Sequence, residues 1–149
     1  MKILGIRNFS GGFRYAILEG DSLSFKCTNL TGENKVIMPK SVIGNDVYAW
    51  YKKEIYRILE THNINKLGIK RNENMRASTY SSLKDVMFFD CIATMAAIDK
   101  KIDVSSFLYS QLKLNSKTVE GYAESHVGKT SKYWDSKIAD AISAAIKTF

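Results

Sequence analysis

The sequence predicts a single α/β domain spanning residues 1–149, built on a mixed five-stranded sheet with helices on both faces. Two observations carry this prediction. Three short apolar or alternating segments joined by polar turns open the chain, which is typical of a three-stranded antiparallel meander. After them, segments with apolar residues at helical spacing alternate with two short apolar runs, which indicates two parallel strands added to the meander.

The meander is predicted over the first 28 residues. Lys2–Arg7 is an almost continuous apolar run, and Gly11-Gly12 supplies the turn chemistry of a plain hairpin. Phe13–Glu19 follows as the second strand. Leu23–Thr28 alternates apolar and polar residues, which suits a third strand with one exposed face.

The middle of the chain alternates helices with short apolar runs. Residues 31–44 contain Gly and the single Pro and are predicted to form a loop. Helices are predicted over 46–62 and 79–100, because apolar residues recur there at helical spacing. The short runs 66–70 and 102–105 are predicted strands.

The last third of the chain is predicted to be mainly helical. A short helix is expected over 106–114, and the polar stretch 115–132 gives no clear prediction. Residues 135–149 form a final helix, with Ile138, Ala141, Ile142, Ala145 and Ile146 on one side.

Composition and charge limit the classes of partner and the cellular location that we expect. The net charge of +7 and the pI near 9.4 favour polyanionic partners such as nucleic acid or an anionic membrane surface. No apolar run approaches the roughly 18 residues of a membrane span, and Met1 leads straight into a strand pattern instead of a signal peptide. We therefore expect a cytoplasmic protein without a membrane partner. Cys27 and Cys91 have neither zinc-site nor disulfide spacing, and buried reduced thiols are expected.

Three segments resemble a known family. ILGIR resembles the ILGID opening of RuvC-type Holliday junction resolvases, a branch of the RNase H-like fold. KLGIKRN resembles the family's central strand, which ends in a catalytic Glu, and SKIADAISAAI resembles the terminal helix with its DxxDA motif. The resemblance implies an RNase H-like fold and a nuclease in which clustered carboxylates hold two divalent metals across a phosphodiester.

The sequence departs from the family pattern at the positions that would hold metal. Arg7 replaces the first Asp, Lys70 followed by Arg71 replaces the central Glu, and Lys137 replaces the earlier Asp of DxxD. Asp140 alone is kept. Because two unit charges 4 Å apart interact by about 4 kcal/mol at an effective dielectric of 20, these cations should expel divalent ions. We expect no metal, no cofactor and no catalytic residue, with Arg7 and Lys70 paired to Asp140.

The hypothesis that follows is a pseudo-nuclease that binds structured or branched nucleic acid through a basic face. The predicted phosphate contacts are Arg7, Lys70, Arg71, Lys132 and Lys137. Lys66, Arg76 and Lys129 belong to segments expected on the same face, although an ordinary solvated surface explains these cations equally well. Tyr133 and Trp134 either stack on bases or anchor the last helix.

Two alternatives stay open at this point. An active Mg²⁺- or Mn²⁺-dependent endonuclease would need a rearranged site, with Asp135 or Glu73 as a displaced ligand. A protein-interaction module would use an apolar patch elsewhere. Met87, Phe88, Phe89 and Met95 are expected in the core, and the same apolar helix is a candidate homodimer interface.

Overall fold

The computed structural model describes residues 1–73 and 79–149. These residues form one mixed sheet of six strands in the order β3-β2-β1-β5-β6, with β4 also paired to β2. The strands are β1 (Lys2–Phe9), β2 (Gly12–Gly20), β3 (Phe25–Cys27), β4 (Lys35–Ile37), β5 (Lys66–Lys70) and β6 (Asp103–Phe107). The antiparallel β1–β2 hairpin continues through parallel β5 and β6, as the sequence predicts.

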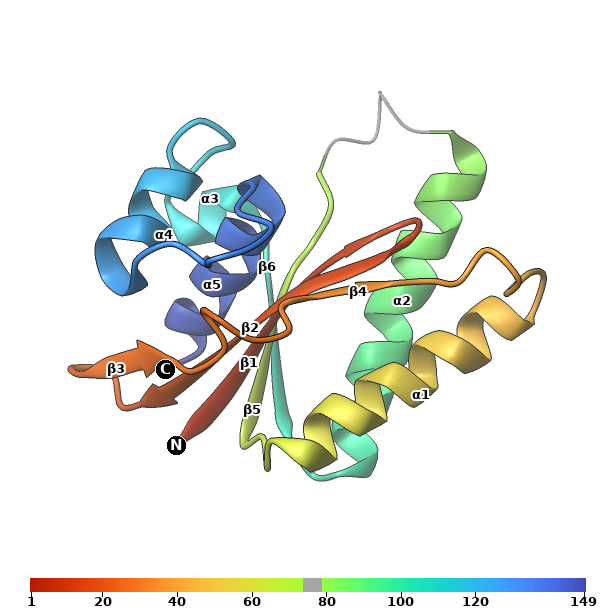
Figure 1. The fold of residues 1–149 in the computed structure, drawn as a ribbon, viewed down its shortest axis with the longest axis horizontal. Helices are drawn as coiled ribbons and strands as arrows, with labels where there is room; N and C mark the ends of the chain where they lie inside the picture. Colours follow the sequence, from red (N-terminus) through yellow and green to blue (C-terminus); the bar gives the residue numbers. More distant parts are fainter. Residues whose placement is uncertain (74–78) are drawn as a thin grey trace.

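The helices cover both faces of the sheet (Figure 1). They are α1 (Asp46–Thr61), α2 (Tyr80–Asp99), α3 (Tyr109–Leu112), α4 (Val119–Val127) and α5 (Ser136–Thr148). One face packs against α1 and α2 in a core that contains Leu4, Ile6 and Leu67. The other face packs against α5, which is covered in turn by α4, and the second core between them contains Ile3 and Ala16.

The central strand β1 alternates its side chains between these two cores. Leu4 and Ile6 lie in the α1–α2 core, whereas Ile3 lies in the α5 core. Gly5 also faces α5, because a Cβ added there would lie 1.9 Å from the carbonyl oxygen of Ala141. The same alternation directs Arg7 toward α5, so one end of β1 presents a cation to that helix.

Helix α5 lies unusually close to the sheet. A Cβ added at Gly68 of β5 would lie 2.6 Å from the carbonyl oxygen of Ala144, which repeats the situation at Gly5. Small residues dominate the buried surface of the helix, and Ala141, Ala144 and Ala145 are fully buried. Glycine on two neighbouring strands and alanine on the helix therefore allow backbone-to-backbone packing.

Two elements were not predicted from the sequence. Strand β4 lies within the segment predicted to be a loop and pairs with β2, from Gly12 opposite Ile37 to Arg14 opposite Lys35, so the described sheet has six strands instead of five. Helix α4 lies in the stretch that gave no clear prediction. Both are short, and α4 buries only Val119 and Ala123, so neither carries a readable period.

Helix α2 differs from its predicted place in the core. Phe89 is fully buried, but Met87, Phe88 and Met95 are 58%, 48% and 64% exposed. The expectation that all four are core residues is therefore wrong for three of them. Cys91 on the same helix is also exposed, whereas Cys27 is buried as expected. Within the described ranges, no helix is both long and apolar enough to cross a bilayer.

Replacing Gly5 tests the close approach of α5. We expect Gly5→Ala to lower the free energy of unfolding by about 3 kcal/mol or to prevent folding, because the added methyl overlaps the Ala141 carbonyl. Gly121→Ala is the matched control, since nothing lies within 4 Å of a Cβ there and Ala favours the helix by about 1 kcal/mol. Urea denaturation of both variants provides the measurement. Equal stability of the two proteins would refute the packing argument.

Candidate functional site

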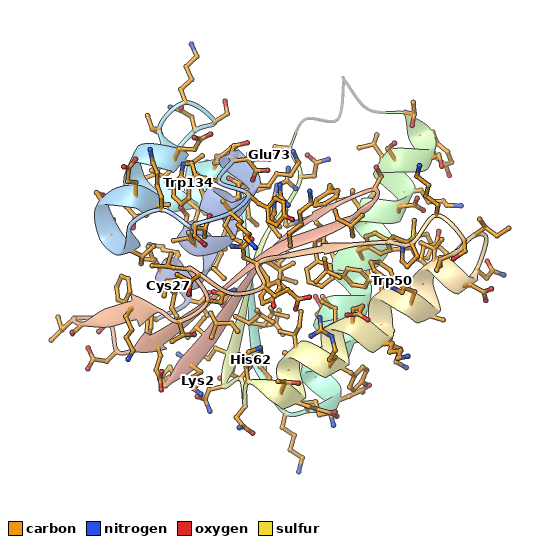
Figure 2. All side chains as sticks on the ribbon, in the orientation of Figure 1. Lys2, Cys27, Trp50, His62, Glu73 and Trp134 are labelled. Atoms are coloured by element: carbon orange, nitrogen blue, oxygen red, sulfur yellow. The ribbon has the colours of Figure 1, made fainter. Side chains whose placement is uncertain are left out.

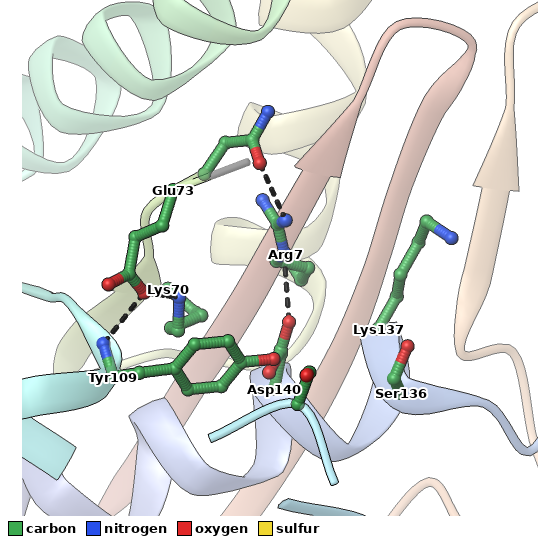
Figure 3. Close-up of a pocket in the computed structure, with 9 residues that line it drawn as sticks. Arg7, Lys70, Glu73, Tyr109, Ser136, Lys137 and Asp140 are labelled. Atoms are coloured by element: carbon green, nitrogen blue, oxygen red, sulfur yellow. Dashed lines mark hydrogen bonds and ion pairs between the residues drawn. The ribbon is translucent and has the colours of Figure 1, made fainter. Parts of the chain in front are cut away.

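A pocket of about 400 Å³ lies where β1 and β5 end and α5 begins. The parallel β1–β5 ladder ends at Ile6 opposite Ile69, so the two strands separate beyond this point. Arg7 follows on one strand and Lys70 on the other. The pocket is lined by Arg7, Lys70, Asn72, Glu73, Tyr109, Ser116, Ser136, Lys137 and Asp140 (Figure 3).

Three acceptors hold the Arg7 guanidinium in place. Its Nε donates to Asp140 Oδ2 at 2.9 Å (Figure 3). Nη1 donates to the Asn8 carbonyl at 3.2 Å, and Nη2 donates to Asn72 Oδ1 at 3.1 Å. The Arg7 side chain is 14% exposed and that of Asp140 is 4% exposed. This ion pair is nearly buried. The structure thus contains the pair that was expected between Arg7 and Asp140.

Asp140 is in a low-dielectric environment on the first turns of α5. Burial raises the pKa of Asp140, and the Tyr109 hydroxyl, Arg7 and Lys70 oppose that rise. The Tyr109 hydroxyl points at the carboxylate (Figure 3), and burial together with Asp140 raises the pKa of Tyr109. Asp140 is therefore surrounded by groups that donate to it or carry positive charge.

Lys70 is paired with Glu73, and the expected pair with Asp140 is wrong. Its Nζ donates to Glu73 Oε2 at 2.6 Å and to the Arg71 carbonyl at 2.8 Å. It also lies 3.7 Å from the centroid of the Tyr109 ring. The Lys70 side chain is 1% exposed, and this burial lowers its pKa. A neighbouring glutamate in the loop after β5 is a nearer partner than a carboxylate across the pocket.

The residues present do not fit a pair of divalent metals. Such ions need several carboxylate oxygens free to converge. Asp140 is bound to Arg7, and Glu73 is bound to Lys70. Among the described residues, no group of three or more His, Cys, Asp or Glu side chains is arranged to hold a metal.

Asp135 caps α5 and forms an ion pair with Arg14. Its Oδ1 accepts the Ile138 backbone N–H at 2.9 Å, which caps the start of α5. It also forms an ion pair with Arg14 at 2.5 Å. Both interactions explain why the pKa of Asp135 is lowered although burial opposes the change.

The fold is similar to that of solved structures. RuvC of Thermus thermophilus in complex with a Holliday junction substrate matches with a TM-score of 0.79 at 15% identity, over 99% of this chain and 92% of that one. The chain has a RuvC-like fold. This agrees with the predicted RNase H-like class.

Two further solved structures are similar. A second T. thermophilus RuvC structure matches with a TM-score of 0.76 and 16% identity, over 99% of this chain and 92% of that chain. The yeast mitochondrial Holliday junction resolvase Ydc2 matches with a TM-score of 0.62 and 14% identity, over 97% and 76%. No protein-family model and no curated protein sequence matches the chain.

The RuvC-like fold brings together only part of the predicted basic set. Lys137 lines the pocket beside Arg7 and Lys70. Arg71 instead lines a groove beside α2 with Asp90 and Cys91.

Other predicted cations lie away from the pocket or outside the described residues. Lys132 is exposed in the loop before α5, and Lys129 forms an ion pair with Glu124. Lys66 begins β5, at the end opposite Lys70. Arg76 lies outside the described residues.

The two aromatic residues before α5 have different surroundings. Trp134 packs against the α5 core, in agreement with an anchoring function (Figure 2). Tyr133 is 55% exposed, and the cations of Arg14 and Lys35 lie 5.5 Å and 4.7 Å from its ring centroid. Tyr133 therefore keeps an accessible edge.

The sequence did not indicate Tyr109, Ser116 and Ser136 as pocket residues. Tyr109 follows β6, and the pairing of Lys70 with Phe107 brings that strand end beside the end of β5. Hydroxyl groups scattered over three segments have no recognisable spacing. Only the tertiary structure places them together.

A second polar network fixes the end of β1 from the opposite face. Asn8 accepts the Tyr51 hydroxyl at 2.7 Å and donates to Asp90 Oδ1 at 2.7 Å. Burial raises the pKa of Asp90, which the Asn8 hydrogen bond opposes. Arg7 and Asn8 are thus anchored on opposite sides of the sheet, which defines the position of Arg7.

Removing Arg7 should leave Asp140 buried without its ion-pair partner. We expect Arg7→Met to lower the free energy of unfolding by about 3 kcal/mol at neutral pH. Arg57→Met is the control: Arg57 also pairs with carboxylates but is 41% exposed, so its loss should cost less than about 1 kcal/mol. Denaturant titrations of both variants measure the difference.

The Arg7→Met deficit should also depend on pH. Without the guanidinium the pKa of Asp140 rises further above its ordinary value. Because the folded state then binds the proton more tightly than the unfolded state, the deficit is full at neutral pH and shrinks as the pH falls through the raised folded-state pKa. A deficit that is constant with pH would show that Asp140 does not carry it.

Proposed function

We propose that this RuvC-like protein binds structured or branched nucleic acid and does not cleave it through divalent metals. The observation that carries the proposal is the pair of ion pairs, Arg7–Asp140 and Lys70–Glu73, at positions where the family resemblance implies metal ligands. Each pair neutralises a carboxylate that would otherwise attract a cation. Among these groups, Asp140 is the family position that keeps its carboxylate.

Charge and fold similarity support nucleic acid as the partner. The chain carries a net charge of +7, and one similar solved structure is a RuvC bound to a Holliday junction substrate. Lys137 lines the pocket at the start of α5, and exposed Lys132 lies in the loop before that helix. Cations in such positions bind phosphates by releasing counterions and need no metal.

A binding experiment tests the nucleic-acid proposal. Fluorescence anisotropy with four-way junction, duplex and single-stranded DNA and RNA should show affinity that falls as salt rises. The double variant Lys132→Gln/Lys137→Gln should reduce the slope of log K against log salt by about 2 if each lysine contacts one phosphate. Lys26→Gln/Lys147→Gln removes the same charge from β3 and the end of α5 and should reduce the slope less.

Two results would contradict this proposal. Absence of salt-sensitive affinity for every substrate would exclude nucleic acid as the partner and favour a protein-interaction module. Mg²⁺- or Mn²⁺-dependent cleavage that Asp140→Asn abolishes would instead establish an active endonuclease with a rearranged site.

We also propose that a second copy of the chain covers the exposed face of α2. Apolar side chains are exposed along this 20-residue helix, and the most exposed are Tyr80, Met87, Phe88, Met95 and Ile98. Tyr80, Met87 and Phe88 line an apolar groove. A helix with this surface is suited to self-association, because an apolar stripe pairs with its own copy across a two-fold axis.

Sedimentation equilibrium tests the proposed homodimer. We expect the protein to be dimeric at micromolar concentration and Met87→Lys/Met95→Lys to shift it to monomer, because charged side chains would be buried at the interface. Ala49→Lys, on the exposed surface of α1, should leave the dimer intact. A functional dimer should have a Kd well below about 0.1 mM. A wild-type protein that is still monomeric at that concentration would therefore contradict the proposal.

A further inference from the structure

The carboxylate of Glu73 occupies a cradle of two hydrogen-bond donors from separate segments. Its Oε2 accepts from Lys70 Nζ at 2.6 Å and from the Tyr109 backbone N–H at 2.7 Å (Figure 3). Lys70 ends β5, and Tyr109 follows β6. One oxygen atom therefore receives a charged donor and a backbone donor at the same time.

The cradle is built from parts that do not depend on Glu73. Lys70 is held by the pairing of β5 with β6, by its bond to the Arg71 carbonyl and by the Tyr109 ring 3.7 Å from its Nζ. Its side chain is 1% exposed, whereas that of Glu73 is 32% exposed. Glu73 is the accessible member of the group, and it lies in the loop after β5, outside the strand pairing.

The cradle also opens onto the pocket. Lys70, Glu73 and Tyr109 line it together with Ser116, Ser136 and Lys137. These last three residues add two hydroxyl groups and one ammonium group to the pocket lining, which also includes the Arg7–Asp140 ion pair. An anion that replaced the Glu73 carboxylate would find further donors within the pocket.

We propose that Lys70 Nζ and the Tyr109 N–H form a phosphate subsite, which the Glu73 carboxylate fills when no ligand is bound. This deepens the proposed nucleic-acid function by naming how phosphate reaches a buried lysine. A non-bridging phosphate oxygen accepts the same two hydrogen bonds as the carboxylate oxygen. Binding therefore exchanges one anion for another, with Glu73 moving into solvent.

The electrostatics of the cradle favour replacement of the Glu73 carboxylate by another anion over a cradle left without an anion. Burial lowers the pKa of Lys70, and a nearby anion stabilises its ammonium form. Although burial opposes the change, hydrogen bonds from Lys70 and Tyr109 lower the pKa of Glu73, which keeps that carboxylate ionised. The subsite thus favours an anionic acceptor, and a phosphate group carries at least one negative charge at neutral pH.

Inorganic phosphate is the direct probe of the subsite. In Glu73→Ala the internal competitor is gone, so phosphate should bind roughly tenfold more tightly than to wild type, as expected for a charge-assisted hydrogen bond to a buried group. Glu60→Ala is the matched control: Glu60 also pairs with a lysine, Lys100, at 2.5 Å, and it precedes β5 at the end of the sheet opposite Glu73. That variant should bind phosphate as wild type does.

The location of binding is read by NMR. The Tyr109 backbone amide resonance should shift on phosphate addition in Glu73→Ala, and in Glu60→Ala it should shift only at roughly tenfold higher phosphate. Glu73→Gln, which keeps an oxygen acceptor for Lys70, supplies the same comparison if Glu73→Ala does not fold. Equal phosphate affinity in the Glu73 and Glu60 variants, or an unmoved Tyr109 amide, would overturn the subsite.

A second arm separates this inference from the proposed function. A short oligonucleotide with and without a 5′ phosphate distinguishes a phosphomonoester ligand from an internal phosphodiester, and inorganic phosphate should compete with the form that binds. If the Glu73 variant binds phosphate but no oligonucleotide, the subsite stands and the nucleic-acid function falls. If oligonucleotides bind wild type and the Glu73 variant equally, the function stands and the subsite falls.

Discussion

The close contact between α5 and the sheet determines the geometry of the pocket. Gly5 and Gly68 face the helix from neighbouring strands, and side chains there would overlap the carbonyls of Ala141 and Ala144. This contact fixes the helix axially and in rotation, because the small residues must remain over the two glycines. Asp140 immediately precedes Ala141, so it is placed beside Arg7, two residues beyond Gly5.

The same packing can support opposite electrostatics. Backbone contact between α5, β1 and β5 does not depend on which charged side chains follow Gly5 and Gly68. In this chain the buried cations Arg7 and Lys70 are balanced by Asp140 and Glu73. Such balance is required, because an unpaired charge at this depth would carry a desolvation cost of several kcal/mol. The excess positive charge must therefore reside on more exposed residues such as Lys137 and Lys132.

The sequence was informative where a local pattern and the tertiary structure agree. The hairpin of β1 and β2, the strand 66–70 and the capped helix α5 all follow from apolar periodicity and turn residues. β4 was missed because three residues are too few to show alternation. The surface of α2 was misassigned because an apolar helix gives no sign of which side is covered.

In the candidate site, too, some contacts could be predicted from the sequence and others depend on the tertiary structure. The proximity of Arg7 and Asp140 could be predicted, because the resemblance to RuvC-type resolvases places both at positions that hold metal ligands in that family. The partner of Lys70 could not, since Glu73 competes from only three residues away and its rotamer depends on the Tyr109 N–H. Tyr109 reaches the pocket only because β6 runs parallel to β5. Loop side chains are therefore the part of such a site that a pattern of elements does not determine.

The end of β1 connects the two faces of the molecule. Beyond Ile6 the strand has lost its β5 partner, and side chains replace that ladder. Arg7 bonds to Asn72 and Asp140 on the pocket side, while Asn8 bonds to Tyr51 and Asp90 on the other. Because adjacent residues of one strand carry both sets of bonds, a displacement of Arg7 along the strand must strain the Asn8 network as well. Rigid placement of the Arg7 guanidinium thus depends on α1 and α2, although neither helix lines the pocket.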